Sequence, residues 1–501
     1  MQKQLNTIVK GAGVVLLGMF LSKIFSYVWR LIIARTGVES YGIFILGMVV
    51  IEVGIMLSFL GPPQSIERFA SYYFAKGDKN KTLGVIKGTT ILAMTAASVM
   101  ALLIFIYADF ISQTFFHTPQ LVPVLKIMTV ALPFLIGSRL LFASMKALQN
   151  IVYAVISRDI IDGLLKIILI GSAFYFGYGL MGITIGFTLA TVSVFFIMGY
   201  FLRNLIKSKI GTGISVEYNY KELLIFSLPL LLNEISWATI KWTDSLFLGY
   251  FKTASEVGIY NAAVPTASLI MNIPLAMLTL FLAIISAEYA RNNMTGIKDI
   301  YTTVSKWIVV LSIPLTATMI LFSKPLLSIL FGAEYAVGWL ALIILVVRYF
   351  IAGVTLINSH IPTMLKKTTF ILKTTLAGAI IGVALNIILI PRLGFVGAAL
   401  SSAISMAIMS ATYVIFVYRN IGVLPFNKKT FSLTTIFLAI TAMLTYLLNT
   451  SKLTLLFTTL LFIVLIIFYS IVIFKWKLIG TEELEFARRA LKKIGLYFGK
   501  K

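Results

Sequence analysis

The sequence predicts an all-α, polytopic membrane protein of about fourteen transmembrane helices. Hydrophobic residues make up 59% of the 501 residues, charged residues make up only 12%, and the mean hydropathy is +0.98. These values lie far from those of soluble globular proteins. A helix needs about 20 residues to cross about 30 Å of hydrocarbon. Apolar runs of that length follow one another along the chain with short connections. No soluble domain of any size is expected.

Each predicted span is an apolar run bounded by charged or turn-forming residues. The first run continues through Lys23 and lacks a small-residue cleavage site, so it indicates a retained span and not a signal peptide. In chain order, we expect spans at 11–34, 41–62, 85–107, 121–145, 155–176, 180–202, 223–249, 257–282, 305–323, 337–362, 371–390, 394–417, 431–448 and 454–474.

The basic residues sort by side of the membrane. With the N-terminus placed in the cytoplasm, thirty of the 42 lysines and arginines fall on the cytoplasmic side and five on the other. Because Lys/Arg bias in short loops sets orientation, this predicts a multi-pass protein of the cytoplasmic membrane with both termini inside. The net charge of +24 therefore reports topology and contact with anionic lipid, and not a nucleic acid partner. The tail over 479–501 is expected to be a basic amphipathic helix on the inner leaflet.

The chain also resembles itself at an offset of 215 to 216 residues. An offset of six helices gives both halves the same orientation, which predicts a parallel repeat about an axis along the membrane normal. We expect an N-lobe over 1–210, a C-lobe over 211–420, two further spans within 421–478 and the tail. Two such lobes enclose a central cleft and transport by rocking about it. The landmarks that match are Gly42 with Gly258, Gly179 with Gly394, Gly182 with Gly397, and Asn204 with Asn420.

Charged residues inside the spans are the candidate binding groups, because ionisable side chains at membrane depth nearly always face a bundle interior or a wet cavity. On the first span Lys23, Tyr27 and Arg30 share one face, and on the seventh Glu234, Trp237, Lys241 and Asp244 do the same. An excess of cations in a cleft suits a phosphate or carboxylate ligand. The predicted cleft cations are Lys23, Arg30, Arg139, Lys241 and Arg348, with Tyr27 and Trp237 as aromatic candidates.

The intramembrane acids have two possible roles, which are ion pairing and coupling to Na⁺ or H⁺. The candidates are Glu52, Glu234 and Asp244. Helical spacing places Asp162 within reach of Lys166, and Lys241 within reach of Asp244. Lys126 and Lys166 lie near enough to a span end to reach a headgroup, and Arg35 is expected to anchor an interface.

Other chemistry has little support in the sequence. The chain has no cysteine, its two histidines are far apart, and no nucleotide-binding motif is present. We therefore predict no catalytic residue, no metal site and no resident cofactor. A membrane glycosyltransferase or polymerase would need a sizeable outer loop, and no predicted outer loop exceeds about 15 residues.

These landmarks together resemble the polysaccharide biosynthesis proteins, which are Wzx-type flippases of the multidrug/oligosaccharidyl-lipid/polysaccharide (MOP) exporter superfamily. The resemblance covers the whole chain and rests on "RLIIARTGVESYG" (30–42), "DSLFLGYFKTASEVGIY" (244–260), "LFGAEY" and the paired "YGLMG" and "LGFVG" turns. It implies a V-shaped, two-lobe transporter, similar to the multidrug exporters called MATE proteins, that moves polyprenyl-diphosphate-linked oligosaccharides outward. The family's cationic cavity matches the cleft cations in kind.

Two alternatives remain within the superfamily, a cation-coupled multidrug exporter and a lipid II flippase. The first span carries two bases and no acid, which weighs against the drug exporter, whereas the lipid II flippase handles the same diphosphate chemistry. As partners we expect the lipid-linked oligosaccharide, membrane lipids and glycan polymerase or glycosyltransferase machinery. The protein is expected to act as a monomer.

Overall fold

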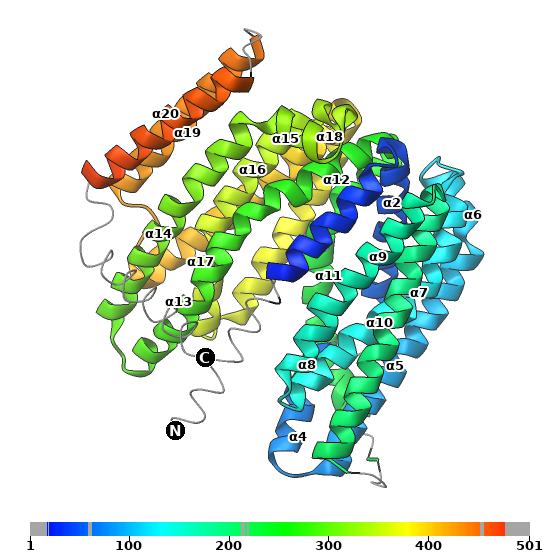
Figure 1. The fold of residues 1–501 in the computed structure, drawn as a ribbon. Coiled ribbons are helices and arrows are strands. Elements are labelled where there is room, and N and C mark those ends of the chain that lie inside the picture. Colours follow the sequence, from blue (N-terminus) through cyan, green and yellow to red (C-terminus); the bar gives the residue numbers. More distant parts are fainter. Residues whose placement is uncertain are drawn as a thin grey trace, which may run out of the picture. The chain divides into compact units, whose positions relative to one another are not determined.

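A computed structural model describes residues 18, 20–58, 63–211, 216–217, 220–450 and 455–475. These residues form helices joined by short turns, with no strand among them (Figure 1). Eight of the described helices are long and apolar enough to cross a membrane. The all-α membrane fold is therefore confirmed, while the count of fourteen spans stays a prediction. The predicted tail over 479–501 lies outside the described residues.

Helical segments coincide with each of the first six predicted spans. Asp78 and Asn150 cap two of them, accepting hydrogen bonds from the backbone N–H groups of Lys81 and Tyr153 at 3.0 and 3.1 Å. The segments are a helix over 20–34, α2 (Val38–Leu57), α5 (Lys79–Ile106), α7 (Leu121–Ala147), the succession α8 (Ile151–Val155), η3 (Ile156–Ile161) and α9 (Asp162–Tyr175), and α10 (Gly179–Lys209). Short pieces connect them: α3 (Pro63–Ser65), η1 (Ile66–Ala70), α4 (Ser71–Ala75), α6 (Ala108–Phe110) and η2 (Ile111–Phe115).

The second half of the chain follows the same plan. One helix, α18 (Thr368–Ile421), covers two predicted spans and is broken at Gly394, whose backbone is not helical. The others are α11 (Tyr220–Phe251), α12 (Ala254–Ser268) with η4 (Leu269–Met271) and α13 (Asn272–Ala290), α14 (Met294–Leu321), α15 (Ser323–Leu330), η5 (Ala333–Gly338) with α16 (Trp339–Val354) and α17 (Leu356–Met364), α19 (Lys428–Thr450) and α20 (Leu455–Lys475).

The chain divides into two compact units. Unit 1 consists of 1–265, 327–341 and 375–405, and unit 2 consists of 266–326, 342–374 and 406–501. This division does not coincide with the expected lobes over 1–210 and 211–420, because α11 and the start of α12 contact helices of the first half. The lobe boundaries therefore stay a prediction.

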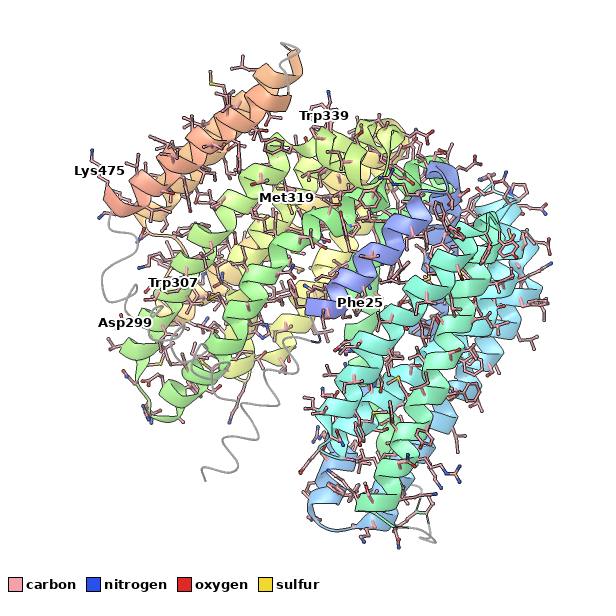
Figure 2. All side chains as sticks on the ribbon, viewed as in Figure 1. Phe25, Asp299, Trp307, Met319, Trp339 and Lys475 are labelled. Atoms are coloured by element: carbon pink, nitrogen blue, oxygen red, sulfur yellow. The ribbon has the colours of Figure 1, made fainter. Side chains whose placement is uncertain are left out.

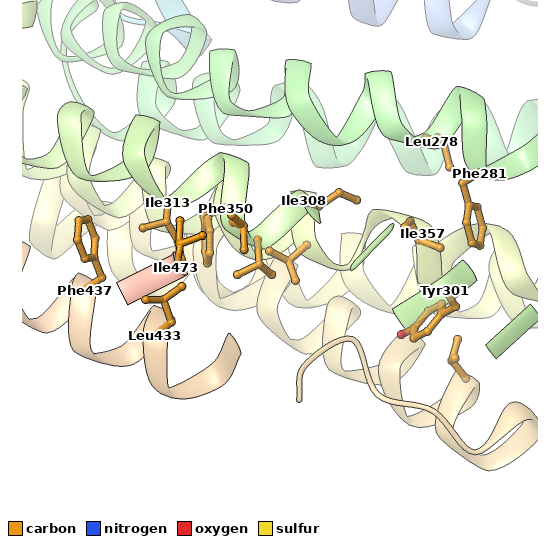
Figure 3. Packing of buried hydrophobic residues seen from close by; sticks show 14 of the residues in the cluster. Leu278, Phe281, Tyr301, Ile308, Ile313, Phe350, Ile357, Leu433, Phe437 and Ile473 are labelled. Atoms are coloured by element: carbon orange, nitrogen blue, oxygen red, sulfur yellow. The ribbon is translucent and has the colours of Figure 1, made fainter. Parts of the chain in front are cut away.

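Unit 2 is held by an apolar core to which the last two helices contribute (Figure 3). The rings of Phe437 on α19 and Tyr469 on α20 lie 4.7 Å apart, and the Tyr469 hydroxyl donates to the Val310 carbonyl of α14. In the same unit the buried Tyr301 hydroxyl donates to Asn358 at 2.6 Å. The appended helices therefore pack on α14 as part of this unit.

The predicted repeat has a counterpart in backbone geometry. Gly179 and Gly394, which match in the sequence, both have a φ of 58°. This conformation strongly favours glycine, because a Cβ would clash with the backbone. Both residues lie where one apolar helix ends and the next begins, so each half has a glycine with positive φ at the equivalent position.

Two other matching glycines lie against each other, where α2 and α12 cross within unit 1. A Cβ on Gly42 would fall 1.7 Å from the Ala254 carbonyl oxygen, and one on Gly258 would fall 2.3 Å from the Val38 carbonyl oxygen. Val38 and Ala254 are themselves one repeat offset apart, so the contact is reciprocal. We call these four residues the cross-repeat contact.

Further hydrogen bonds join the two halves of the sequence near this contact. The Tyr41 hydroxyl donates to the Asn261 carbonyl at 3.1 Å, and the Tyr335 hydroxyl donates to the Ala34 carbonyl at 2.9 Å. Arg35 Nη2 donates to the Ile329 carbonyl at 2.6 Å, at the C-terminal end of α15. Arg35, predicted to anchor an interface, thus satisfies backbone carbonyls that a helix end leaves unpaired.

Glycine also lets the helix over 20–34 approach its neighbours. Figure 2 shows Phe25 on this helix, drawn in blue. A Cβ on Gly163 of α9 would lie 2.5 Å from the Phe25 Cβ, so only glycine lets α9 come this close. The packing fixes the helix that carries Lys23 and Arg30 within unit 1.

Candidate functional site

An ion pair between α2 and α7 lies at the centre of the candidate site. Arg139 Nη2 on α7 lies 2.8 Å from Glu52 Oε1 on α2. The Glu52 side chain is 16% exposed and that of Arg139 is 38% exposed, so the carboxylate is the more buried partner. Two residues predicted to have separate roles, a cleft cation and a coupling acid, are thus brought together.

Two further predicted cations join this pair. Lys241 on α11 lies within electrostatic range of Glu52, Arg139 and Arg30. Arg30, on the helix over 20–34, is also within range of the Tyr41 hydroxyl. We call Arg30, Arg139 and Lys241, together with Glu52, the cationic cluster; it draws one residue from each of four helices.

A neighbouring pair on α9 is neutral overall. Lys166 Nζ lies 2.8 Å from Asp162 Oδ2, as the i,i+4 spacing predicts, and Lys166 is also within electrostatic range of Glu52. Lys126, which was expected to reach a headgroup, lies 3.0 Å from Asp109. Both lysines therefore have a carboxylate partner from the protein.

Aromatic rings flank the two cations of the cluster that form no ion pair with a described carboxylate. The Arg30 guanidinium lies 5.0 Å from the centroid of the Trp29 ring, and Lys241 Nζ lies 4.6 Å from that of Trp242. A ring face stabilises a cation without using its N–H donors. Arg30 and Lys241 therefore keep donors available for an anion.

The other predicted site residues are placed differently. Lys23 is exposed, and Trp237 is 43% exposed on α11. Tyr27 packs its ring against Phe331, with centroids 5.9 Å apart. Arg348 is buried in unit 2, with its guanidinium 4.6 Å from the Tyr349 ring centroid, so its place beside the other cations stays a prediction.

Asp244 does not form the expected pair with Lys241. Its carboxylate is buried and accepts hydrogen bonds from the Tyr260 hydroxyl at 2.7 Å and from Asn386 Nδ2 at 2.9 Å. The expectation was wrong because i,i+3 spacing shows what lies within reach on one helix, whereas donors from α12 and α18 approach this carboxylate more closely. The Asp244 side chain is thus buried, with neutral hydrogen-bond partners.

The third predicted acid, Glu234, lies on the same helix in a different setting. Its Oε1 accepts a hydrogen bond from Gln64 Nε2 of α3 at 2.9 Å. The partners Gln64, Tyr260 and Asn386 were not predicted as site residues. The one signal that could have found them is a polar side chain within an apolar run, which Asn386 shows on α18.

The chain has the fold of MOP superfamily transporters. It matches a solved lipid II flippase, MurJ, in an inward closed conformation, with a TM-score of 0.68 at 17% identity, over 92% of this chain and 98% of that one. It also matches an inward-facing multidrug resistance MATE transporter with a TM-score of 0.67 at 13% identity, over 80% of this chain and 94% of that one. Residues 229–388 match the MatE family.

Residues 8–282 match the family described as polysaccharide biosynthesis protein, which is more than half of the chain. The chain belongs to this family.

It is 26% identical over 203 residues to a protein of Haloferax volcanii described as "Probable low-salt glycan biosynthesis flippase Agl15", an alignment covering 40% of this chain and 43% of that protein. It is 23% identical over 448 residues to an uncharacterized membrane protein of Methanocaldococcus jannaschii, covering 84% of this chain and 86% of that protein. The chain spans under half the length of Agl15. Agl15 and MurJ are both described as flippases, which agrees with the expectation that the protein is not an enzyme.

Proposed function

We propose that this protein is a flippase that moves polyprenyl-diphosphate-linked oligosaccharides across the cytoplasmic membrane by alternating access. The observation that carries the proposal is the cationic cluster. Charged side chains at membrane depth are costly, so an excess of cations there needs a compensating anion. A lipid-linked diphosphate supplies that anion at the depth where the lipid headgroup must cross.

Family membership supports the same substrate class. The family description and that of Agl15 refer to polysaccharide and glycan biosynthesis respectively. A cation-coupled multidrug exporter would use membrane-embedded acids to bind sodium or protons, whereas Glu52 pairs with Arg139. A lipid II flippase shares the diphosphate chemistry and differs in the sugar.

Asp244 is our proposed coupling residue for Na⁺ or H⁺. Glu52 is paired with Arg139, and Glu234, which is partly exposed, accepts from Gln64. Asp244 is buried, has neutral hydrogen-bond partners and forms no ion pair with a described basic residue. A buried carboxylate with neutral partners offers oxygen ligands to a small cation.

The remaining elements of the proposal concern location and partners. We propose a monomer in the cytoplasmic membrane with both termini in the cytoplasm. Glycosyltransferases that build the oligosaccharide would act before it, and a polymerase or transferase that consumes the oligosaccharide would act after it.

Arg30→Ala and Lys241→Ala are each expected to reduce surface glycan strongly while leaving the protein in the membrane. Each removes a cation that forms no ion pair with a described carboxylate, so the loss is expected to fall on ligand binding and not on packing. The measurement is surface glycan in a strain that depends on this gene, with membrane levels followed by immunoblot.

Arg291→Ala is the matched control. Its side chain is 74% exposed and lies 3.2 Å from Glu288, so removing this cation should leave glycan unchanged. Wild-type glycan in both cluster variants at wild-type protein levels would contradict the proposal. Drug resistance conferred by the gene without any glycan defect would favour the drug exporter.

A further inference from the structure

We propose that Tyr41 is a positioning residue that connects Arg30 to Asp244, so that a cation bound at Asp244 weakens the hold of Arg30 on its anionic ligand. The inference rests on the proposed function, because it takes Arg30 as a ligand-binding residue and Asp244 as the coupling residue. It adds the physical connection between these two residues, which lie on different helices of unit 1.

Tyr41 lies between Arg30 and α12. Its side chain on α2 is fully buried, and its hydroxyl donates its one proton to the Asn261 carbonyl at 3.1 Å. The hydroxyl oxygen keeps its lone pairs, and the Arg30 guanidinium is near enough to donate a hydrogen bond to it. Because a hydroxyl that donates one hydrogen bond accepts another more strongly, the Asn261 carbonyl helps Tyr41 to hold the Arg30 side chain.

The segment of α12 that Tyr41 contacts is itself tied to Asp244. The Tyr260 hydroxyl donates to Asp244 Oδ2 at 2.7 Å. The next residue, Asn261, donates from Nδ2 to Ser245 Oγ at 2.9 Å. Two consecutive residues of α12 thus bond to two consecutive residues of α11, and all four side chains are buried. The position of α12 beside Tyr41 therefore depends on what occupies the Asp244 carboxylate.

A small cation at Asp244 competes with the Tyr260 hydroxyl, because both are attracted to the same carboxylate oxygens. When the hydroxyl gives way, α12 is released from α11 at this point and the Asn261 carbonyl moves away from Tyr41. Arg30 then loses the fixed oxygen that orients it, so an arriving anion must first order the guanidinium. This sign suits outward transport, since a lipid that leaves in exchange for an entering cation has to be released when the cation binds.

Charge alone predicts the opposite sign. A cation that neutralises Asp244 makes the surroundings of Arg30 more positive, which should strengthen anion binding through space. Weaker anion binding in the presence of the cation therefore indicates the hydrogen-bonded connection. The direction of the effect separates the two mechanisms.

The experiment measures binding of a short-chain prenyl-diphosphate N-acetylglucosamine to the full-length protein in nanodiscs of neutral lipid. Each protein is titrated in Na⁺ and in choline at equal ionic strength, and binding of radioactive Na⁺ is measured with and without the lipid probe. We expect Na⁺ to weaken probe binding to wild type by about fivefold or more, which is the lower end of typical coupling between two sites. By linkage, the probe must weaken Na⁺ binding by the same factor.

Two variants break the connection at its two ends. Tyr41→Phe removes the hydroxyl and keeps the ring, which lies against Phe331 and Tyr335. It should still bind Na⁺, but its probe affinity in choline should fall by about fivefold, to the wild-type value in Na⁺, and Na⁺ should weaken it no further. Tyr260→Phe should keep the wild-type probe affinity in choline, because Tyr41 still holds Arg30, and should likewise lose the weakening by Na⁺.

Tyr335→Phe is the matched control. Tyr335 is also buried in unit 1, and its hydroxyl donates to the Ala34 carbonyl, on the helix over 20–34, at 2.9 Å. Its ring centroid lies 6.3 Å from that of Tyr41, so general loosening around these rings would appear in this variant as well. Tyr335→Phe should keep the wild-type response to Na⁺.

The outcomes separate this inference from the proposed function. A Tyr41→Phe protein that keeps the wild-type response to Na⁺, or that no longer binds Na⁺, overturns the positioning role of Tyr41, as does a Tyr335→Phe protein that loses the response. Na⁺ that leaves probe binding to wild type unchanged, or strengthens it, also overturns the connection, although the flippase proposal survives. Wild type that does not bind the probe overturns the proposed function itself.

Discussion

Gly42→Ala is expected to destabilise the protein markedly, although the substitution adds a single methyl group. The new Cβ would fall 1.7 Å from the Ala254 carbonyl oxygen, a backbone atom that a side-chain rotation cannot move. The helices α2 and α12 would have to separate, and the adjacent hydrogen bond from Tyr41 to Asn261 would lengthen. Overpacking of this kind costs about 1 to 3 kcal/mol, and a clash with backbone belongs at the upper end. The measurement is the apparent Tm of the purified protein in detergent.

The reciprocal substitution and a control test the same contact. Gly258→Ala should destabilise less, because its Cβ would lie 2.3 Å from the Val38 carbonyl oxygen. Gly199→Ala, within α10, has no atom within 4 Å of its new Cβ and should be neutral or slightly stabilising. A Tm for Gly42→Ala equal to that of Gly199→Ala would show that α2 and α12 do not cross at this position.

The helices could be predicted because they depend on local patterns, and the repeat could be predicted because short motifs recur at one offset. An apolar run of about 20 residues predicts a span wherever its partners lie. The break in α18 at Gly394 was foreseen for the same reason, since two predicted spans met between 390 and 394. The Asp162–Lys166 pair belongs to this class, because its spacing lies on one helix.

For the candidate site, the sequence indicated charged residues within the spans but not which of them pair. Glu52 and Arg139 are 87 residues apart, and Asp244 and Asn386 are 142 apart, so no periodicity relates them. Which acid meets which base depends on how α2, α7, α11 and α18 pack, and one sequence alone does not give that packing. In the structure Glu52 pairs with Arg139. Asp244 accepts hydrogen bonds from Tyr260 and Asn386, and not from Lys241 as expected.

Asp244→Ala is expected to destabilise the protein and to abolish coupling to the ion gradient. The substitution leaves the Tyr260 hydroxyl and the Asn386 amide buried without their shared acceptor. Loss of a buried hydrogen-bond acceptor costs about 1 to 3 kcal/mol, and here two buried donors share the acceptor, so this is one of the larger single-residue effects. Asp109→Ala is the control, because Asp109 is 58% exposed and its pair with Lys126 should contribute about 1 kcal/mol or less.

Asp244→Asn separates the structural role of this residue from the proposed coupling role. Asn386 Oδ1 is buried and has no hydrogen-bond partner, so the Asn386 amide can turn over and accept from the new side-chain N–H₂. Tyr260 can still donate to the remaining oxygen, and the apparent Tm should therefore stay close to that of wild type. Transport in proteoliposomes should nevertheless lose its response to an imposed Na⁺ or H⁺ gradient, because the charge that binds the cation is gone. A stable Asp244→Asn protein that keeps the wild-type gradient response would show that this carboxylate holds α11, α12 and α18 together and does not couple transport to an ion.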